Sequence, residues 1–438
     1  MSKSAQPGAI TGKISATPNP IRFGQGCVVI SWETNDPAGG EVRVSTSPGD
    51  EKLVSQSKGR SGQTEIPWIV DSTVYDFRLY AASQPDTPID SVQVRRDLDS
   101  AGAVLRGIAD EVTRGTIDIM ELSQFIATVM PRCLHSGKFH EIFPIWERHG
   151  FHVTPVHFYQ PIPDTQSLPQ NLWDRPSELV GIDMNESVQL DLLRNSFPKF
   201  RDEYEQFRTS STGEPGRFHL SNDLFDGTDA LVAYCMIRHF QPRLIIEVGS
   251  GFSSLISAEA AAKNNNSALI CIEPFPQDFL RRGFPQLRSL IEKKVEDIDL
   301  EFFSQLDSGD ILFIDSSHTV KIGGDVNYLF LEVLPRLKPG VIVHIHDIFL
   351  PFDYRRDWVM DEFHFWSEQY LLQAFLSFNA EFEVLMCNSY LGLYYLEDLK
   401  STFPNSPWWA DTRIGVPRGG GSFWMRRRPR EQTKSPKL

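Results

Sequence analysis

The sequence lacks the features of disulfide-bonded and membrane-spanning proteins. Its five cysteines are scattered over 438 residues without C-x-x-C spacing, which excludes an obvious zinc site or disulfide frame and favours buried thiols in a reducing compartment. The N-terminus has no apolar signal core, and no run approaches the roughly 20 apolar residues that span a bilayer. We therefore expect a cytoplasmic protein without a membrane partner.

The sequence also lacks the positive charge that a nucleic-acid partner would require. Its net charge is −14 at pH 7, whereas nucleic-acid phosphates favour clustered lysine and arginine. No internal repeat at solenoid periods is visible. The chain is longer than one hydrophobic core usually organises, so two or three domains are expected. A small-molecule or glycan partner is therefore favoured over DNA or RNA.

Residues 8–96 show short strand patterns separated by turn signals. The segments CVVISWET, EVRVSTS, VYDFRLYAAS and SVQVRR alternate apolar and polar residues, and NDPAGG, SPGD and KGRSGQ lie between strand segments. This spacing predicts a small β-sandwich. Trp32 and Tyr75 resemble the core tryptophan and the tyrosine corner of a fibronectin type III-like domain. Such a module has no obvious catalytic residue, and its default role is binding or packing.

Three further segments complete the predicted organisation. In residues 97–150, apolar residues recur at three- and four-residue steps, which predicts a helical connector. Its apolar face fits packing on the catalytic domain or on a second copy of the chain, so a homo-oligomer is one expectation. Residues 151–425 are predicted to form one further domain, which includes an ordered arm at its N-terminal end. Residues 426–438 are basic and are predicted to be a disordered tail.

The most informative stretch is Leu244–Ser254, which reads LIIEVGSGFSS. An apolar strand pattern ends in an acid, and two glycines then precede an amphipathic helix. Gly249 and Gly251 allow a tight turn and a close approach of the backbone to a ligand, while the first turn of the helix offers unpaired N–H groups. This order predicts a nucleotide-type loop at the end of a strand.

Two acidic positions follow at the ends of the next predicted strands. ALICIEP ends in Glu273, where an acid in a doubly wound sheet meets ribose hydroxyls through its two acceptor oxygens. A third strand, predicted over 290–295, leads to Glu296 and Asp297. Acids at this position often hydrogen-bond the adenine amino group, and the choice between these two residues is open.

The groups for chemistry follow two later strands. GDILFIDSSH places Asp315 and His318 after one strand, and PGVIVHIHDIF places His344, His346 and Asp347 at the end of another. Because neighbouring parallel strands end at one crevice, Asp315 and Asp347 could share a ligand. Two carboxylates suit Mg²⁺, Ca²⁺ or Mn²⁺. Equally, the site could be metal-free, with both carboxylates orienting His318 or the substrate. One of the two strand histidines should pack against a helix while the other faces the cleft.

These motifs together resemble a known family. The order E-x-G-x-G in LIIEVGSGFSS, with Ser253 in the third small position, resembles the first motif of class I S-adenosylmethionine-dependent methyltransferases. With CIEPFP, DILFIDSSH and HIHDIFLPFDY, it resembles a bacterial group within a broad methyltransferase-24 type family. The resemblance implies a Rossmann-like α/β fold with a doubly wound, mostly parallel sheet. It also implies that Asn222, Asp226 and Asp229 lie near the cofactor.

The resemblance implies a role for each candidate residue. The methionine part of S-adenosylmethionine would be held by Glu247, Gly249, Ser250, Gly251 and Ser253, with Asp315 also near the cofactor. Glu273 would hold the ribose, and Glu296 or Asp297 the adenine. By similarity to metal-dependent O-methyltransferases, Asp315 and Asp347 would bind Mg²⁺ or another divalent cation, and His318 would be the general base. Ile348, however, stands where catechol-type enzymes have an asparagine ligand.

The predicted function is O-methylation of a hydroxyl on a small molecule, sugar or glycan. Two alternatives are a cofactor-binding interaction protein that acts through the β-sandwich, and a metal-dependent hydroxylase, for which no clear set of two histidines and one carboxylate is visible. Residues 350–378 predict an aromatic segment that is either a substrate lid or core, in which arginines could grip phosphate or carboxylate. Residues 391–396 and the later stretch GGGSFWMRR are predicted to be the closing antiparallel strands of the same sheet.

Overall fold

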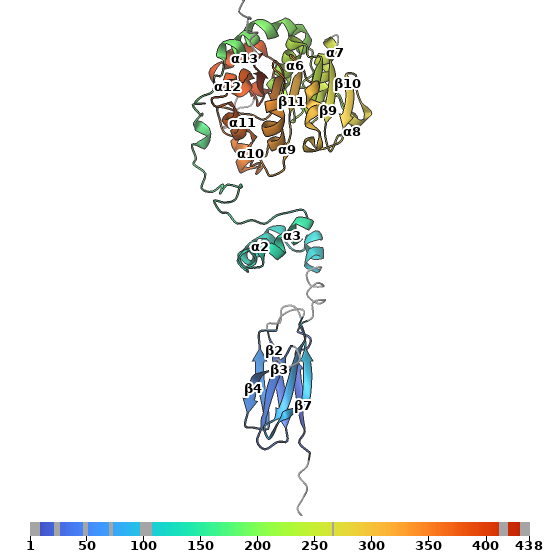
Figure 1. The fold of residues 1–438 in the computed structure, drawn as a ribbon, viewed down its shortest axis with the longest axis vertical. Coiled ribbons are helices and arrows are strands. Elements are labelled where there is room, and N and C mark those ends of the chain that lie inside the picture. Colours follow the sequence, from blue (N-terminus) through green and yellow to red (C-terminus); the bar gives the residue numbers. More distant parts are fainter. Residues whose placement is uncertain are drawn as a thin grey trace, which may run out of the picture. The chain divides into compact units, whose positions relative to one another are not determined.

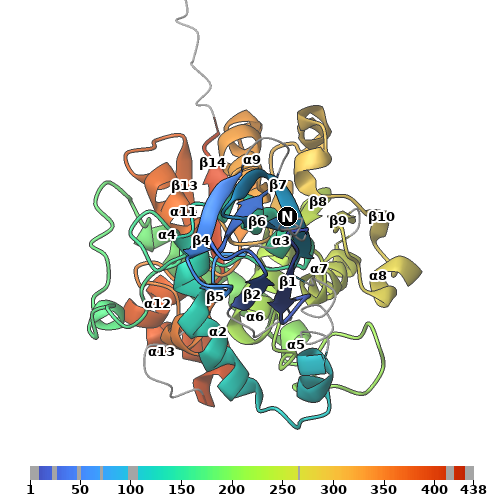
Figure 2. The ribbon, with the colours of Figure 1, turned by 90° about the horizontal axis from the view of Figure 1, so that it is seen from below.

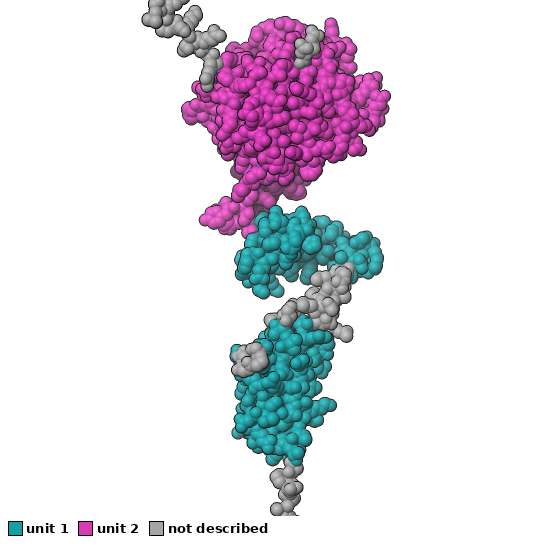
Figure 3. All heavy atoms as spheres, turned by 45° about the vertical axis from the view of Figure 1, so that its right-hand side comes forward, with its two compact units in different colours: residues 1–154 teal, residues 155–438 magenta. Residues whose placement is uncertain are grey.

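In a computed structural model the chain forms two compact units, residues 1–154 and 155–438 (Figure 3). The structure describes residues 9–21, 27–46, 51–69, 73–96, 107–264, 267–410 and 419–429. Within these ranges, no helix combines the length and the apolar character that crossing a membrane requires. The finer division into four segments stays a prediction.

The first unit begins with two antiparallel sheets (Figure 1). One has the order β1 (Gly12–Thr17), β2 (Val28–Thr34), β5 (Ser61–Ile66), and the other β4 (Lys52–Ser57), β3 (Gly40–Ser45), β6 (Tyr75–Ala81), β7 (Gln84–Val94). Alternate residues of β2, namely Val28, Ile30 and Trp32, are buried in one apolar core. The predicted all-β domain is confirmed, while its fibronectin type III-like character stays a prediction.

Helices follow the sheets in the first unit. Residues 107–113 are helical, and α2 (Ile119–Leu134) and α3 (Phe139–Arg148) come next. The carboxylate of Asp118 caps α2 by accepting a hydrogen bond from the backbone N–H of Met120 at 2.6 Å. No residue of α2 or α3 is buried, so the apolar side chains of both helices remain at the surface of this unit.

The second unit is built on one sheet of seven described strands. Its order is β10 (Leu287–Ile291), β9 (Ala268–Ile272), β8 (Leu244–Val248), β11 (Ile311–Ile314), β12 (Ile342–Ile345), β14 (Phe423–Arg427), β13 (Phe382–Cys387). β14 runs antiparallel to both neighbours, whereas the pairs from β10 to β12 are parallel. Figure 2 shows β10 and β13 at opposite edges of the sheet.

Helices cover both faces of this sheet. In β8, Ile245 packs into the apolar core that includes α6 (Gly227–Phe240) and α7 (Phe252–Lys263), whereas Leu244 and Ile246 pack into the core on the other face. The second core includes residues of α11 (Glu368–Leu376). The remaining helices are α4 (Glu186–Asp191), α5 (Arg201–Tyr204), α8 (Asp278–Arg282), α9 (Asp325–Tyr328), α10 (Arg356–Met360), α12 (Asn388–Tyr394) and α13 (Leu396–Thr402). The predicted doubly wound α/β fold is confirmed.

Two local predictions near the C-terminus differ from the structure. The expected strand over 391–396 is wrong, because α12 occupies most of it and β13 ends earlier, at Cys387. In α12, Asn388, Leu391 and Gly392 are buried at helical spacing, whereas alternating burial would mark a strand. In addition, β14 continues through Arg427, so the sheet extends two residues into the predicted tail, most of which lies outside the described residues.

Candidate active site

The loop between β8 and α7 lies at the switch point of the sheet. From β8 the sheet continues through β9 to β10, whereas from β11 it continues through β12 toward the opposite edge. The strand order therefore changes direction between β8 and β11. Gly249 has a φ of 75°, and a Cβ atom there would lie 1.7 Å from the carbonyl oxygen of Asp315. Glycine therefore allows this loop to pass against the end of β11. At Gly251, an added Cβ would meet nothing within 4 Å, so that part of the loop is open.

A cavity of about 510 Å³ lies beside this loop, and we name it the glycine-loop cavity. It is lined by the carboxyl ends of β8, β9 and β11 and by residues 294–296 and 321–325. Of the predicted cofactor ligands, those that line it are Gly249, Glu273, Glu296 and Asp315. Glu296 lines the cavity, whereas its exposed neighbour Asp297 does not. The sequence alone did not distinguish these two acids as candidate ligands of the adenine.

Glu273 lies against the glycine loop. One of its carboxylate oxygens accepts a hydrogen bond from the backbone N–H of Ser250 at 3.2 Å, and the other accepts one from the N–H of Phe275 at 2.8 Å. These bonds fix the carboxylate at the edge of the glycine-loop cavity. A carboxylate held in this way can accept further hydrogen bonds from a ligand hydroxyl, because each oxygen has two lone pairs.

Glu247 is directed into the protein. It is fully buried and does not line the cavity. Its Oε1 accepts hydrogen bonds from the hydroxyls of Ser253 and Ser254 at 2.6 and 2.9 Å. Burial raises the pKa of Glu247 to about 8, against the effect of these two bonds. In this structure Glu247 and Ser253 therefore brace the start of α7, and their predicted contact with the methionine part of the cofactor stays a prediction.

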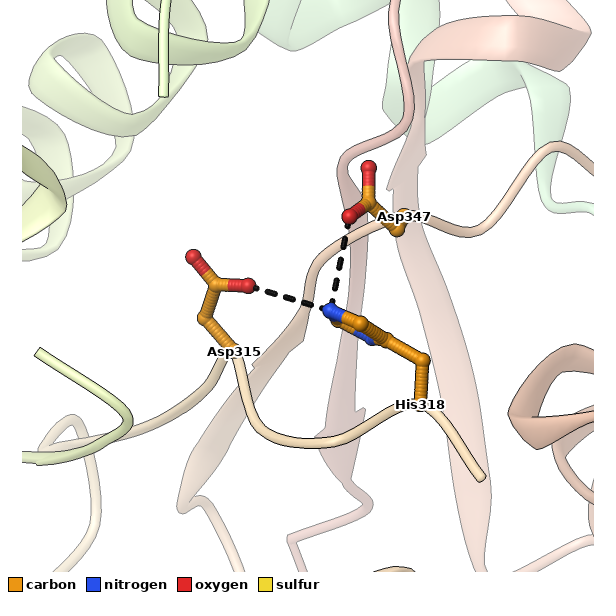
Figure 4. A group of neighbouring side chains, drawn as sticks. All are labelled: Asp315, His318 and Asp347. Carbon is orange, nitrogen blue, oxygen red and sulfur yellow. Dashed lines mark ion pairs between the residues drawn. The ribbon is translucent and has the colours of Figure 1, made fainter. Parts of the chain in front are cut away.

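Asp315, His318 and Asp347 meet at the ends of β11 and β12 (Figure 4). His318 Nε2 lies 3.5 Å from Asp315 Oδ1 and 3.4 Å from Asp347 Oδ2. Figure 4 shows the ring nitrogen directed at the gap between the two carboxylates. The structure thus brings together the three residues predicted to carry the chemistry.

The backbone at two of these residues adopts a left-handed conformation. His318 has a φ of 55° and Asp347 a φ of 56°. Such a conformation costs on the order of 1–3 kcal/mol for a residue other than glycine, and it persists where surrounding contacts hold it. At His318 the backbone carbonyl accepts hydrogen bonds from the N–H groups of Ser367 and Glu368 at 2.9 and 3.0 Å. The loop after β11 is thereby attached to the start of α11.

Glu368 also holds the ring of His318, a contact that the sequence did not reveal. His318 Nδ1 lies 2.9 Å from Glu368 Oε2, and the Glu368 side chain is fully buried. In the sequence Glu368 is one residue of the aromatic segment 350–378, and it lies 50 residues from its partner. A carboxylate on Nδ1 fixes the ring orientation and leaves Nε2 as the nitrogen that faces Asp315 and Asp347.

His346 also faces these two carboxylates. Its Nδ1 lies 3.4 Å from Asp315 Oδ1 and 3.6 Å from Asp347 Oδ2, and its Nε2 lies 3.5 Å from Asp229 Oδ2. His344 is instead fully buried, with its ring centroid 3.9 Å from that of Phe313. This decides which strand histidine faces the cleft. His346 and Asp229 are site residues whose roles the sequence did not assign.

The carboxylates keep both histidines protonated. Burial lowers the pKa of His318, but hydrogen bonds with Asp315 and Glu368 and the charge of Asp347 outweigh it and raise the pKa to about 10. Burial also lowers the pKa of His346, but the charges of Asp347 and Asp315 outweigh this effect. The pKa of His346 therefore lies well above its usual value. With only protein groups around them, both imidazole rings are in the protonated, positively charged form at neutral pH.

The donor atoms are spaced like ligands of one cation. Asp315, His318 and Asp347 each offer an atom within 4.8 Å of the others, and His346 Nδ1 approaches the same two carboxylate oxygens. Adjacent ligand atoms about 2.0–2.3 Å from a metal ion lie roughly 3.0–3.7 Å apart. Each histidine is also backed by a carboxylate, as metal-binding histidines usually are. This group of two histidines and two carboxylates, which was not visible in the sequence, fits a divalent cation.

A second cavity, of about 580 Å³, lies on the other side of this group, and we name it the tryptophan cavity. Asp347 and His346 line it, whereas His318 lines neither cavity. Its other walls come from residues 221–229, 355–366 and 407–408 and include Trp358, Trp366 and Trp408. The ring of Trp366 also packs on that of His318, with centroids 4.4 Å apart.

Three residues that the resemblance placed near the cofactor do not line the glycine-loop cavity. Asp226 and Asp229 line the tryptophan cavity and not the glycine-loop cavity. Asn222 lines neither; its side chain accepts hydrogen bonds from the N–H groups of Leu224 and Phe225 and stabilises the turn before α6. The physical reason is that α6 starts beside the end of β12 and the segment just before β14, where Asp229 Oδ2 accepts a hydrogen bond from the N–H of Gly421 at 2.8 Å.

Known proteins match part of the chain. A family model described as a methyltransferase domain matches residues 246–348. Over 162 residues the chain is 35% identical to an uncharacterized protein of Archaeoglobus fulgidus, a match that covers 35% of this chain and 73% of that protein. Among solved structures, the O-methyltransferase from Bacillus cereus in complex with SAH is 13% identical with a TM-score of 0.25, covering 45% of this chain and 82% of that chain. This structural likeness is too low to carry an inference about a substrate.

Proposed function

The chain belongs to the class I S-adenosylmethionine-dependent methyltransferases, and we propose that it transfers the methyl group to a hydroxyl oxygen of a small molecule or glycan. The proposed reaction takes place at Asp315, His318 and Asp347. The acceptor loses its hydroxyl proton and becomes a methyl ether, and S-adenosylhomocysteine is the second product.

The position of two aspartates between two cavities carries this proposal. Asp315 lines the glycine-loop cavity and Asp347 lines the tryptophan cavity, and both lie within 3.5 Å of His318 Nε2. A methyl donor in the first cavity and an acceptor in the second would meet at these carboxylates. Holding both reactants in line supplies a large part of the acceleration of such a transfer.

The glycine-loop cavity has the groups that S-adenosylmethionine needs. The fixed carboxylate of Glu273 would accept hydrogen bonds from the ribose hydroxyls, and Glu296, which lines the same cavity, would accept one from the adenine amino group. The open backbone at Gly251 and the first N–H groups of α7 suit the carboxylate of the methionine part. The bound donor supplies a methyl group on a positively charged sulfur, so the protein has only to position it and to remove the acceptor proton.

His318 is the proposed general base. Its Nε2 would take the hydroxyl proton while the acceptor oxygen bonds to the methyl carbon and the carbon–sulfur bond breaks toward sulfur. Glu368 acts as a positioning residue, because its hydrogen bond to Nδ1 fixes the ring. The raised pKa means that His318 must first lose a proton. A positive charge beside Asp315 and Asp347 would disfavour the protonated form of His318 and would lower the pKa of His318 toward neutrality.

We propose Asp315, Asp347 and His346 as the protein ligands of a divalent cation. His346 Nδ1 lies 3.4 Å from Asp315 Oδ1 and 3.6 Å from Asp347 Oδ2. The carboxylate of Asp229 faces the other ring nitrogen of His346. A bound cation supplies Lewis acidity that lowers the pKa of a nearby hydroxyl. Among divalent cations, Mn²⁺ suits a set of two carboxylates and one imidazole and is the probe for the tests below.

Methyl transfer from tritium-labelled S-adenosylmethionine to a panel of sugars and phenols tests this function. We expect transfer by the wild-type chain and, for His318→Ala, a loss of at least about a hundredfold in turnover, because a positioned base contributes about 10² to 10⁴. S-adenosylhomocysteine affinity should change less than about twofold, since His318 does not line the glycine-loop cavity. Unchanged turnover in His318→Ala would contradict the assigned role.

A further inference from the structure

The walls of the tryptophan cavity indicate which acceptor it takes. We propose that the acceptor is an amino sugar, that is, a polyhydroxylated ring that carries an ammonium group near Asp223, Asp226 and Glu362. This inference rests on the proposed function, because it names the substrate class of the same site.

The first argument is the charge of the cavity. Asp223, Asp226 and Glu362 line it in addition to Asp229 and Asp347. Within the described part of the chain, no lysine or arginine forms an ion pair with Asp223, Asp226 or Glu362, and Glu362 has only His364 Nδ1 at 3.6 Å. Carboxylates gathered around a cavity without matched cations favour a positively charged ligand.

The single arginine among the described lining residues does not balance this charge. Arg355 is 7% exposed, and its guanidinium donates two hydrogen bonds to the carboxylate of Asp357, at 3.1 and 2.6 Å. That pair satisfies its charge within the protein. A phosphate or a carboxylate ligand would therefore meet mostly negative groups, which disfavours nucleotide sugars and uronic acids.

A tryptophan fixes one of these three carboxylates, that of Asp226. Its Oδ1 accepts a hydrogen bond from Trp408 Nε1 at 2.7 Å, so the carboxylate is held at the cavity wall. Burial raises the pKa of Asp226, and the charge of Asp229 adds to this shift against the effect of the Trp408 bond. An ammonium group beside Asp226 would offset the repulsion between Asp226 and Asp229. It would also replace the contact with water that the Asp226 carboxylate loses on burial.

The second argument is the fixed aromatic wall. Trp408 packs against the backbone of Gly227, where an added Cβ would lie 1.7 Å from the indole. Trp366 stacks on His364, with centroids 5.0 Å apart and planes 6° apart. Rigid indole rings contact the apolar face of a sugar ring, and they also attract ammonium groups. Charge and stacking together select an amino sugar over a neutral sugar or an open-chain amine.

Calorimetric titration with three probes in the presence of S-adenosylhomocysteine tests this inference. The probes are a β-1,4-linked glucosamine disaccharide, its N-acetylated form and spermine, at a pH below the pKa of the sugar amine. We expect the glucosamine disaccharide to bind at least about tenfold more tightly than the acetylated form. It should also bind more tightly than spermine, because spermine has no ring to stack on the indoles.

Two variants with the same change of charge sharpen the test. Asp226→Asn keeps an acceptor oxygen for Trp408 and removes the charge, so glucosamine disaccharide affinity should fall at least about fivefold. Asp202→Asn removes an exposed charge on α5 that does not line the cavity, and it should bind like the wild type. Equal binding of the acetylated probe or of spermine, an unchanged affinity in Asp226→Asn, or no binding of the glucosamine disaccharide would overturn the inference. Since the cofactor product is titrated separately, its failure to bind would count against the proposed function instead.

Discussion

The two cavities on either side of Asp315 and Asp347 are built from different kinds of groups. The glycine-loop cavity rests on backbone: Gly249 passes against the end of β11, and N–H groups hold Glu273 in place. The tryptophan cavity rests on side chains, three indoles and five carboxylates, from segments far apart in the chain. In the proposed function, backbone geometry would hold the methyl donor, whereas side chains, which can be exchanged more readily, would suit a particular acceptor. Changes on one side should therefore leave the ligand of the other side unaffected.

The largest expected effect on the donor side comes from Gly249→Ala. The substitution places a Cβ against the Asp315 carbonyl at a φ of 75°, so we expect the free energy of unfolding to fall by about 2–4 kcal/mol. Gly251→Ala is the matched control, because its Cβ would meet nothing within 4 Å. Chemical denaturation measures both. Equal losses in the two variants would mean that the contact between the loop after β8 and the end of β11 is not what requires glycine.

The next effect separates the two histidines that lie between the cavities. His346→Ala removes a proposed ligand, so Mn²⁺ affinity should fall at least about tenfold. His318→Ala, the matched change at the other histidine near these carboxylates, should keep Mn²⁺ affinity within about threefold of the wild type. Calorimetric titration with Mn²⁺ distinguishes them. If His318→Ala lost the greater share of affinity, His318 would be the ligand and not the base.

Glu247→Gln tests whether this acid braces the loop. Burial raises the pKa of Glu247 from 4.5 to about 8, so between these pH values the folded state keeps a proton that the unfolded state has lost. Stability of the wild type should therefore decline, relative to Glu247→Gln, by at least about 1 kcal/mol as pH rises from about 5 to about 8. Urea unfolding at several pH values measures this. Parallel profiles for the two chains would show that Glu247 is not buried in this way.

The smallest effect distinguishes two adjacent acids. Glu296→Gln should raise the Kd for S-adenosylhomocysteine about three- to tenfold, since one hydrogen bond contributes about 0.5–1.5 kcal/mol. Asp297→Asn, which does not line the glycine-loop cavity, should change it less than about twofold. The reverse order would place the adenine on the Asp297 side.

The parts of the glycine-loop cavity that could be predicted from the sequence are local in the chain. The buried strand, the acid and the two glycines are contiguous in Leu244–Ser254, and Glu273 follows the next strand. The convergence of Asp315, His318 and Asp347 could also be predicted, because neighbouring parallel strands end at the same edge of the sheet.

The other contacts of the site depend on tertiary packing and could not be predicted. Glu368 reaches His318 across 50 residues, and Trp408 reaches Asp226 across 182. No periodicity links such pairs. The sequence also could not decide between Glu296 and Asp297, because adjacent residues in a short turn differ in exposure only through packing.

The most direct test of the central claim is a calorimetric titration with S-adenosylhomocysteine, with and without Mg²⁺. The account predicts binding at one site and at least about tenfold weaker binding to Glu273→Gln, because charge-assisted hydrogen bonds contribute about 1.5–3 kcal/mol. An absence of binding in both conditions, or an unchanged affinity in Glu273→Gln, would contradict the assignment of the glycine-loop cavity to the methyl donor.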